Sequence, residues 1–181
     1  MSLPIRSKRL LLRRFSDEDV RDIVEFVSHP SVARATPEIE ATESGVRKYI
    51  DTQKTYLPFE LDKCFDLAIQ RVAGGKVIGL LTLIRRNHQQ GELGYALSIE
   101  YRGHGYATEA ASALANYAFT VLKLHRICAT TSSGNQDSFH VMERLGMRRE
   151  ARMREATSQD GAWLDVLVYA ILAEEWPASG L

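Results

Sequence analysis

Residues 101–110, YRGHGYATEA, combine residue types that suit the binding of a phosphate group. Gly103 and Gly105 flank His104, Arg102 precedes them, and an alanine-rich segment follows. Glycine tolerates positive φ and leaves backbone N–H groups accessible, and the first amides of a helix attract anions. The residues before the loop alternate apolar and polar side chains, as a strand does. Taken alone, this order of strand, glycine loop and helix indicates an anion site or, equally, a plain strand-to-helix turn.

Two well-known nucleotide-binding loops match this stretch poorly. A P-loop requires GxxxxGK[ST], and the GGKV at 74–77 lacks both the spacing and the hydroxyl. A dinucleotide loop requires GxGxxG, but Thr108 stands where the third glycine belongs. The stretch also follows a run of predicted antiparallel strands instead of opening a βαβ repeat. A nucleotide-dependent oxidoreductase is therefore the least favoured interpretation.

The elements that must position this loop form one predicted α+β domain over residues 1–181, in the order βααβββαβαββ. The expected strands are 8–15, 64–72, 76–86, 92–100, 125–133 and a closing hairpin of 147–157 and 162–173. The expected helices are 16–28, 43–57, 105–122 and 135–145. We expect residues 29–41 to form a loop, because Pro30 and Pro37 interrupt regular structure.

Composition excludes several classes of protein. The 181 residues include 23 basic and 23 acidic side chains, so no overall charge attracts the chain to nucleic acid. No apolar run approaches 18 residues and the N-terminal segment lacks the apolar core of a signal peptide, which predicts a cytoplasmic protein without a membrane partner. Cys64 and Cys128 occur without a CxxC or a histidine pair, so we expect no metal site and two small, buried apolar side chains.

RGHGYA, through Arg102, Gly105 and Ala107, is similar to the Q/R-x-x-G-x-G/A pyrophosphate loop of the GNAT superfamily of acetyl-CoA-dependent N-acetyltransferases. The resemblance covers nearly the whole chain and looks like the RimJ/RimL-type branch, which resembles ribosomal-protein N-terminal acetyltransferases. The segments that carry it, in order, are RLLLRRFSDEDVRDI, ELGYALSIEYRGHGYATEA, HRICATTSSGNQDSFHVMERLGM and DVLVYAILAEEW. The resemblance implies the GNAT fold, with a mixed, mostly antiparallel sheet of about seven strands flanked by four helices.

The same resemblance implies an N-acetyltransferase that passes acetyl from acetyl-CoA directly to a primary amine in a ternary complex. The residues it implies for binding CoA pyrophosphate through their amides are His104, Gly105, Tyr106, Ala107 and Thr108, in the loop that Gly103 opens. Arg102 would pair with phosphate or remain a solvated loop arginine. The main chain of Leu97, Ser98 and Ile99 would hydrogen-bond pantetheine like an added strand. The strand that begins near His125 would splay away and open a slot for the thioester.

Acetyl transfer requires a neutral amine and stabilisation of the departing thiolate. An α-amine titrates near pH 7.8 and a lysine near 10.4, so an N-terminus needs only a weak or water-relayed base. Glu92 is the first candidate for that base, because this branch often carries an acid there; a surface glutamate that opens a strand is the alternative. Tyr95, three residues later, points to the other face of the strand, so we do not expect it to share the role of Glu92.

The superfamily pattern N-x-x-A-x-x-x-Y-x-x-x-G-F corresponds here to Asn135, Ser138, Met142, Gly146 and Met147. Met142 replaces the tyrosine that commonly protonates the thiolate and cannot donate a proton, which puts the usual mechanism in doubt. The Ser138 hydroxyl would instead hydrogen-bond the CoA sulfur. Asn135, one helical turn earlier, would contact the cofactor, cap the helix, or do both.

The amine acceptor is the least defined part of the prediction. Residues 28–60 and the hairpin loop 157–162 are expected to line its site. A solvated acidic loop or a negative rim for a cationic amine would both account for Glu38, Glu40 and Glu43. A peptide N-terminus, a polyamine, an amino sugar and an antibiotic amine all stay open as acceptors.

Three further expectations concern the activity and the assembly. An acyl-cysteine route through Cys128 is disfavoured, because no base can be assigned beside it. A non-catalytic acyl-CoA-binding regulatory module is the alternative function, for which Met142 is the hint. The superfamily often dimerises through exposed sheet edges, so the resemblance leaves a homodimer open, whereas the sequence itself does not define the oligomeric state.

Overall fold

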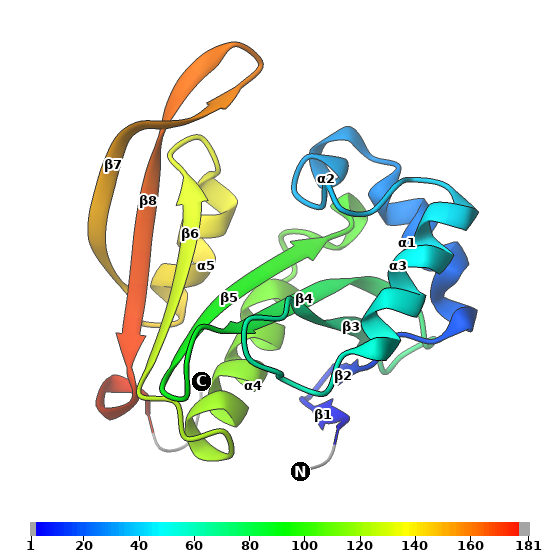
Figure 1. Ribbon diagram of the computed structural model, residues 1–181, viewed down its shortest axis with the longest axis horizontal. Coiled ribbons are helices and arrows are strands. Elements are labelled where there is room, and N and C mark those ends of the chain that lie inside the picture. Colours follow the sequence, from blue (N-terminus) through cyan, green and yellow to red (C-terminus); the bar gives the residue numbers. More distant parts are fainter. Residues whose placement is uncertain (1–2, 178–181) are drawn as a thin grey trace.

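The computed structural model describes residues 3–177, so the two ends of the predicted domain 1–181 lie outside the described residues. An eight-stranded mixed sheet forms the centre of the molecule, and the described helices pack on its two faces (Figure 1). The strands are β1 (Ile5–Arg6), β2 (Leu10–Arg13), β3 (Phe65–Arg71), β4 (Val77–Arg85), β5 (Gln90–Leu97), β6 (Arg126–Ser132), β7 (Arg148–Gln159) and β8 (Ala162–Leu172). The helices are α1 (Val20–Val27), α2 (Pro30–Ala33), α3 (Glu43–Thr55), α4 (Tyr106–Thr120) and α5 (Gln136–Arg144).

The sheet consists of two parts that separate along most of their shared boundary. The strand order is β1-β2-β3-β4-β5-β6-β8-β7, and every described pair is antiparallel except β5 with β6. These two strands pair only where Gln90–Glu92 of β5 meets Arg126–Cys128 of β6. Beyond these residues the strands diverge, and Figure 1 shows the two parts of the sheet as separate arms above this junction. The predicted splay of the strand after His125 is therefore present.

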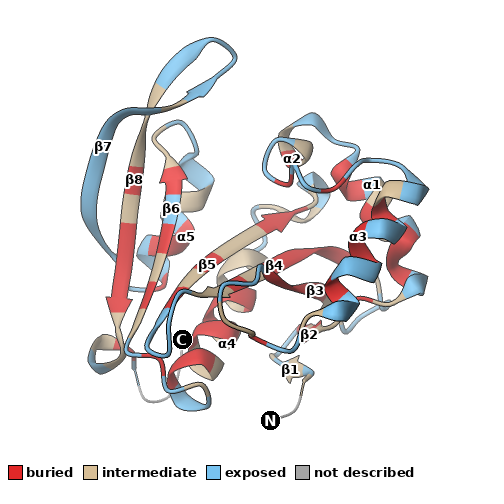
Figure 2. Ribbon diagram, in the orientation of Figure 1, coloured by how far each residue is buried: buried red, intermediate tan, exposed pale blue. Residues whose placement is uncertain are grey.

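Two apolar clusters occupy the two faces of the sheet, because successive side chains of a strand point to opposite faces. On β5, Leu93 and Leu97 pack into the cluster that contains α4, whereas Ala96 packs into the cluster that contains α1 and α3. The central strands and the inner helix faces are the buried parts of the molecule (Figure 2). Burying a leucine fully contributes about 1.5–3 kcal/mol, so side chains such as Leu81 and Leu114, both fully buried, fix the helices to the sheet.

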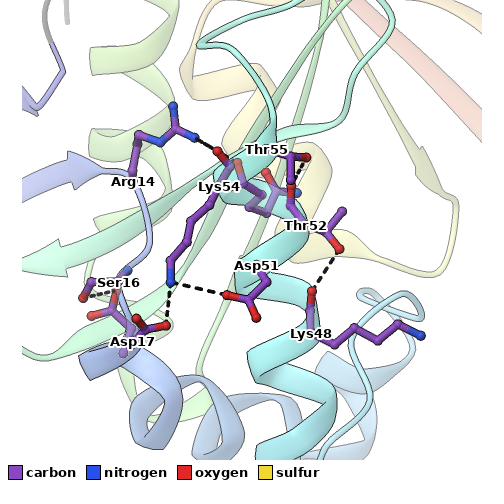
Figure 3. A network of polar contacts seen from close by, with 10 residues as sticks. Arg14, Ser16, Asp17, Lys48, Asp51, Thr52, Lys54 and Thr55 are labelled. Atoms are coloured by element: carbon purple, nitrogen blue, oxygen red, sulfur yellow. Dashed lines mark hydrogen bonds and ion pairs between the residues drawn. The ribbon is translucent and has the colours of Figure 1, made fainter.

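Both ends of α3 are capped by side chains. Thr42 begins the helix by accepting a hydrogen bond from the Gly45 amide at 3.0 Å, as predicted. Arg14 ends it, since one guanidinium nitrogen donates to the carbonyls of Gln53, Lys54 and Tyr56 at 3.0 Å each. Lys54 also pairs with Asp17 and Asp51 (Figure 3). Arg14 and Asp17 together hold α3 against the segment that joins β2 to α1.

The predicted order of elements is confirmed, and two short elements are added to it. The first is β1, which extends the sheet edge by two residues. The second is α2, so the prediction that residues 29–41 contain no regular structure is wrong. Pro30 occupies the first turn of α2, where a helix leaves its N–H groups unpaired and proline is therefore tolerated.

The prediction for the cysteines is also wrong. Cys64 is exposed and Cys128 is half-buried, so neither belongs to the apolar core. Cys64 precedes β3 in an irregular segment, and Cys128 lies at the end of the short pairing between β5 and β6. Within residues 3–177, no helix combines the length and apolarity that a membrane span requires.

Candidate active site

A cleft of about 530 Å³ lies where β5 and β6 diverge. Four segments meet there: α2, the end of β5 with the glycine loop that follows it, the start of α5, and the tip of the β7–β8 hairpin. The lining residues used below are Arg34, Tyr95, Leu97, Arg102, Gly103, Gly105, Tyr106, Ala107, Thr108, Asn135, Ser138 and Gln159. The cleft therefore brings together most of the residues predicted to bind the cofactor.

The glycine loop has the conformation expected of an anion site. Gly103 and Gly105 have φ of 76° and 77°, which side-chain-bearing residues rarely adopt, and Gly105 is the residue immediately before α4. The first helical hydrogen bond runs from the Glu109 amide to the Gly105 carbonyl at 3.0 Å. Among the described residues, the amides of 104–108 donate to no protein acceptor. The buried Thr108 hydroxyl also lacks a partner within 3–177, so these donors fit a bound phosphate.

Arg9 braces this loop from outside the cleft. Its guanidinium donates to the His104 carbonyl at 3.0 Å and lies 4.3 Å from the centroid of the Tyr106 ring. It also forms an ion pair of 2.6 Å with Glu109, in the first turn of α4. Because this charge is already paired, Arg9 shapes the loop, and the amides and Thr108 face the cleft.

Arg102 and the end of β5 are arranged differently from the prediction. The Arg102 Nε donates to the Leu97 carbonyl at 3.3 Å, so the side chain folds back along its own loop. Of the three residues predicted to contact pantetheine, only Leu97 lies on β5; Ser98 and Ile99 turn away towards a short 3-10 helix, Ile99–Tyr101. The Ser98 amide is engaged by the Ile78 carbonyl at 2.9 Å. The part of β5 left unpaired by β6 is therefore the segment after Glu92.

Ser138 lies in the first turn of α5, facing the cleft. Asn135 is the N-cap of this helix, and its side-chain oxygen accepts a hydrogen bond from the Ser138 amide at 3.2 Å. The predicted capping role of Asn135 is therefore present, and its side chain also lines the cleft. Met142, one turn later, is 1 % exposed and packs in the core, where it can neither reach solvent nor donate a proton.

Sequence reasoning missed the position of the Tyr95 hydroxyl. Its oxygen lies 2.7 Å from the Ser138 carbonyl and 3.1 Å from the Ser138 hydroxyl. As predicted, Tyr95 and Glu92 point to opposite faces of β5, because residues of different parity on a strand do so. The unusual tyrosine in ELGYAL was visible in the sequence, but its partner is 43 residues away and could not be identified.

Glu92 lies on the face of the sheet that carries α1 and α3, the same face as Ala96. Its Oε2 receives two hydrogen bonds from Arg86, at 2.6 and 3.1 Å. Within residues 3–177, Glu92 is not among the side chains that line the cleft. The structure therefore separates Glu92 from Ser138 by the thickness of the sheet.

Asp66 is a second acid on the face of Glu92 that sequence reasoning missed. It is 2 % exposed and accepts hydrogen bonds from Tyr49 at 2.6 Å, from Gln53 at 3.1 Å and from Thr82. Burial raises the pKa of Asp66 to about 6, and the hydrogen bonds from Thr82 and Tyr49 only partly oppose it. The signal available in the sequence was an acid inside the apolar run CFDLAI, which predicts a buried charge.

Neither cysteine is suited to act as a nucleophile. Desolvation and the nearby Asp66 raise the pKa of the Cys64 thiol to about 12. Desolvation and Glu92 also raise the pKa of Cys128. Because the thiolate is the reactive form, both thiols are unreactive near neutral pH. In the described part of the chain, no three His, Cys, Asp or Glu side chains are grouped so that they could hold a metal ion.

The predicted acceptor wall is only partly assembled at the cleft. Glu38, Glu40 and Glu43 are all exposed. From residues 28–60 the cleft is lined by Ser31, Arg34 and Ala35, and from the hairpin loop by Gln159. The acidic loop thus lies on the α1–α3 side of the molecule, where the charge of Glu38 also acts on Asp66.

Known proteins resemble this chain in sequence and in fold. The sequence pattern of the family described as "Acetyltransferase (GNAT) domain" matches residues 9–148. The "Uncharacterized N-acetyltransferase YnaD" of Bacillus subtilis (strain 168) is 34% identical over 176 residues, which are 95% of this chain and 98% of that protein. The "Spermidine N(1)-acetyltransferase" of Escherichia coli (strain K12) is 28% identical over 92% of this chain and 88% of its own length.

A solved structure of an acetyltransferase (GNAT family) from Bacillus anthracis superimposes with a TM-score of 0.83 at 31% identity, covering 96% of this chain and 100% of that one. The chain therefore belongs to the GNAT N-acetyltransferases, as the resemblance to the RimJ/RimL-type branch predicted. Members of this family use acetyl-CoA and acetylate amines.

Proposed function

We propose that this chain transfers acetyl from acetyl-CoA directly to a primary amine, with both substrates bound at the opening between β5 and β6. The observation that carries the proposal is the group of unpaired donors at the start of α4: the amides of 104–108 and the Thr108 hydroxyl. A pyrophosphate offers hydrogen-bond acceptors to these donors, and the positive end of the helix adds to the attraction. Pantetheine would then extend along the unpaired edge of β5 near Leu97 towards Ser138.

The proposed reaction follows from the positions of Glu92 and Ser138 on the two faces of β5. The amine nitrogen attacks the thioester carbonyl carbon, and the carbon–sulfur bond of the resulting tetrahedral adduct breaks. The leaving sulfur carries the electron pair and receives a hydrogen bond from the Ser138 hydroxyl. The proton lost by the amine passes to Glu92, directly or through a water, from the opposite face. Its Oε1 has no protein partner within residues 3–177, which supports this role.

Direct transfer is favoured over an acyl-enzyme. The raised pKa values of Cys64 and Cys128 keep both thiols protonated, so neither competes with the amine for the acetyl group. Met142 supplies no proton, so the sulfur leaves as a hydrogen-bonded thiolate that solvent protonates. The Ser138 hydroxyl thus stabilises the thiolate, a step for which a side-chain acid is often used.

The acceptor is a primary amine whose class is left open between a peptide N-terminus and a small molecule. The relative named as a spermidine acetyltransferase makes a polyamine one candidate. The exposed Glu38, on the face from which the amine would approach, favours a cationic acceptor. The cytoplasmic location and the homodimer remain predictions.

The test is calorimetric titration with acetyl-CoA, followed by a CoA-release assay against pooled peptides, polyamines and aminoglycosides. We expect micromolar binding of acetyl-CoA and turnover with one pool. Glu92→Gln and Ser138→Ala should each lower kcat at least tenfold with little change in acetyl-CoA affinity. Glu150→Gln is the matched control, since Glu150 forms a similar ion pair with Arg126 at 2.5 Å outside the cleft.

Three outcomes would contradict the proposal. Absence of acetyl-CoA binding would remove the assigned role of the loop. Binding without turnover against every pool would favour the alternative of a regulatory acyl-CoA-binding module. Wild-type rates in Glu92→Gln or in Ser138→Ala would remove the role of that residue.

A further inference from the structure

The Tyr95 hydroxyl lies within hydrogen-bond distance of both the main chain and the side chain of Ser138. Its oxygen lies 2.7 Å from the Ser138 carbonyl oxygen and 3.1 Å from the Ser138 Oγ. Tyr95 comes from β5 and Ser138 from α5, so this contact joins the two walls of the cleft. Both residues line the cleft, and both are half-buried.

The hydrogen positions follow from what each partner can do. A carbonyl oxygen only accepts, so the phenolic proton of Tyr95 is committed to the Ser138 carbonyl, the shorter of the two contacts. The phenolic oxygen is then left to accept the proton of the Ser138 hydroxyl. The single proton of the serine hydroxyl therefore points to Tyr95 before the reaction. It turns about the Cβ–Oγ bond to the sulfur once the thiolate, a stronger acceptor, has formed, while the contact of Tyr95 with the Ser138 carbonyl keeps Oγ in place.

The peptide groups on both sides of Ser138 are fixed. Its amide donates to the side chain of Asn135 at 3.2 Å, and its carbonyl accepts from Tyr95. A side chain whose own backbone is held at both ends loses little further freedom when it makes a new hydrogen bond. Asn135 fixes the first turn of α5 internally, and Tyr95 limits the motion of that turn relative to β5.

We infer that Tyr95 is the positioning residue for Ser138 and compensates in this way for the methionine at 142. This inference rests on the proposed role of Ser138. Tyr95 holds the serine hydroxyl in reach of the leaving sulfur and remains protonated throughout the reaction. The rate then depends on the hydrogen bond that the Ser138 hydroxyl donates to the thiolate and not on the transfer of a proton from the protein.

Tyr95 itself is a poor proton donor to sulfur. Burial raises the pKa of Tyr95 to about 12. A thiol titrates near 8.5, so transfer of the phenolic proton to a thiolate is unfavourable by a factor of about a thousand or more. Retention of the proton also preserves the hydrogen bond to the Ser138 carbonyl.

The experiment is a double-mutant cycle on kcat with Tyr95→Phe, Ser138→Ala and the double variant. Phenylalanine keeps the ring in the cleft and removes only the hydroxyl. We expect Tyr95→Phe to lower kcat about five- to tenfold, with the KM for acetyl-CoA changed by less than twofold. The double variant should be no slower than Ser138→Ala alone, because Tyr95 acts through Ser138.

Tyr169→Phe is the matched control. The Tyr169 hydroxyl donates to Glu143 at 3.2 Å, near the other end of α5, so its removal loosens the same helix away from Ser138. We expect Tyr169→Phe to leave kcat unchanged. An equal loss of kcat in Tyr169→Phe would show a general effect on α5 and overturn the inference.

Three other results distinguish the inference from the proposed function. A slow Ser138→Ala with Tyr95→Phe at the wild-type rate would overturn the inference and leave the function intact. In a further result, the losses of kcat in the two single variants multiply in the double variant, and Tyr95→Phe removes the basic limb of the kcat–pH profile. Tyr95 would then be an independent proton donor, and the inference would be overturned. Ser138→Ala at the wild-type rate would remove the role of Ser138 and the inference with it.

Discussion

The two faces of β5 use different chemistry. On the face of α4 and α5, the proposed cofactor side, the groups assigned to phosphate are main-chain amides of 104–108, which a single stretch of chain supplies. On the face of α1 and α3, the proposed acceptor side, the polar groups are the side chains of Glu38, Asp66 and Glu92, from three separate segments. Under this proposal, the cofactor side depends on backbone conformation, whereas the acceptor side depends on which acids stand at a few positions.

This difference has a direct consequence for substitution. Main-chain donors survive most changes of side chain, provided that glycine remains where φ is positive. The charge of a carboxylate is lost when a neutral residue replaces it. Because the loop does not depend on these side chains, substitutions can change the charge of the acceptor side without disturbing the loop. We expect variants of this chain to separate cleanly into those that alter acetyl-CoA binding and those that alter the acceptor.

The largest expected effect concerns Asp66 and the stability of the acceptor side. Because the folded pKa of Asp66 is about 6 and its ordinary value is 3.8, the folded state binds the proton more tightly, and stability falls as pH rises through this window. The difference corresponds to roughly 3 kcal/mol. Asp66→Asn should remove this loss. The free energy of unfolding of the variant, measured in denaturant, should therefore rise relative to that of the wild type between pH 4 and pH 7.

Asp19→Asn provides a control of opposite sign for that measurement. Burial would raise the pKa of Asp19, but hydrogen bonds from Arg13 and Ser16 hold it below its ordinary value. The free energy of unfolding of the wild type should therefore rise relative to that of Asp19→Asn as the pH rises from acid values. The same sign for both variants would mean that the folded pKa of Asp66 lies below its ordinary value, and no pH dependence for Asp66→Asn would mean that folding leaves its pKa unchanged.

The next effect concerns the cofactor side. Gly105→Ala forces a side chain into φ of 77°, which costs about 1–2 kcal/mol, at the residue where the phosphate loop meets α4. We expect the dissociation constant of acetyl-CoA to rise about tenfold and the acceptor KM to stay constant. Gly74→Ala, at φ of 82° with open space around it, carries the same strain in the β3–β4 turn and should leave acetyl-CoA affinity unchanged. Equal acetyl-CoA affinity in Gly105→Ala and Gly74→Ala would contradict a phosphate site built from the backbone of the loop.

Much of the cofactor side was predictable from the sequence, because its signals are local. Gly103, Gly105 and the capping Asn135 all act within a few residues of themselves, and each has the predicted conformation or role. The order of strands and helices followed from hydrophobic periodicity for the same reason. Whether the loop residues bind CoA is still a prediction.

The acceptor side could not be predicted, because its contacts join distant segments. Tyr49 and Thr82 meet Asp66 across 17 and 16 residues. On the other face of β5, the contact of Tyr95 with Ser138 was missed for the same reason, since it spans 43 residues. The short helix α2 was missed because proline was taken as a breaker at the position where it is tolerated. The exposed Cys64 was missed because its residue type favours burial, and tertiary structure decided otherwise.

A smaller effect is expected at Gly94, on the acceptor face of β5. A Cβ added there would lie 3.4 Å from the Cβ of Thr82 and would meet no other described atoms beyond that side chain. Gly94→Ala should therefore fold normally and raise the acceptor KM several-fold by narrowing the approach of the amine. Steady-state kinetics with both substrates varied would check this, and a change confined to the acetyl-CoA KM would reverse the assignment of the two faces.

The smallest effect is expected for the ion pair of Arg86 with Glu92. The Arg86 side chain is 51% exposed, and exposed pairs contribute about 0–1 kcal/mol. Arg86→Met should change the free energy of unfolding by less than about 1 kcal/mol in denaturant titrations. A loss several times larger would mean that the acids of this face serve the fold and not the acceptor.

The short pairing of β5 with β6 has a mechanical consequence. Strand pairing between the five-stranded and the three-stranded part of the sheet is confined to three residue pairs in the described chain. Apolar contacts span the same boundary, since Leu93 of β5 and Ile127 of β6 share one cluster. Such contacts have no preferred direction, so the two parts can change their mutual angle at less cost than strands joined along their full length. We therefore expect the sheet to be most compliant along this line, where the proposed substrates would meet, and to separate there first under a pulling force across it.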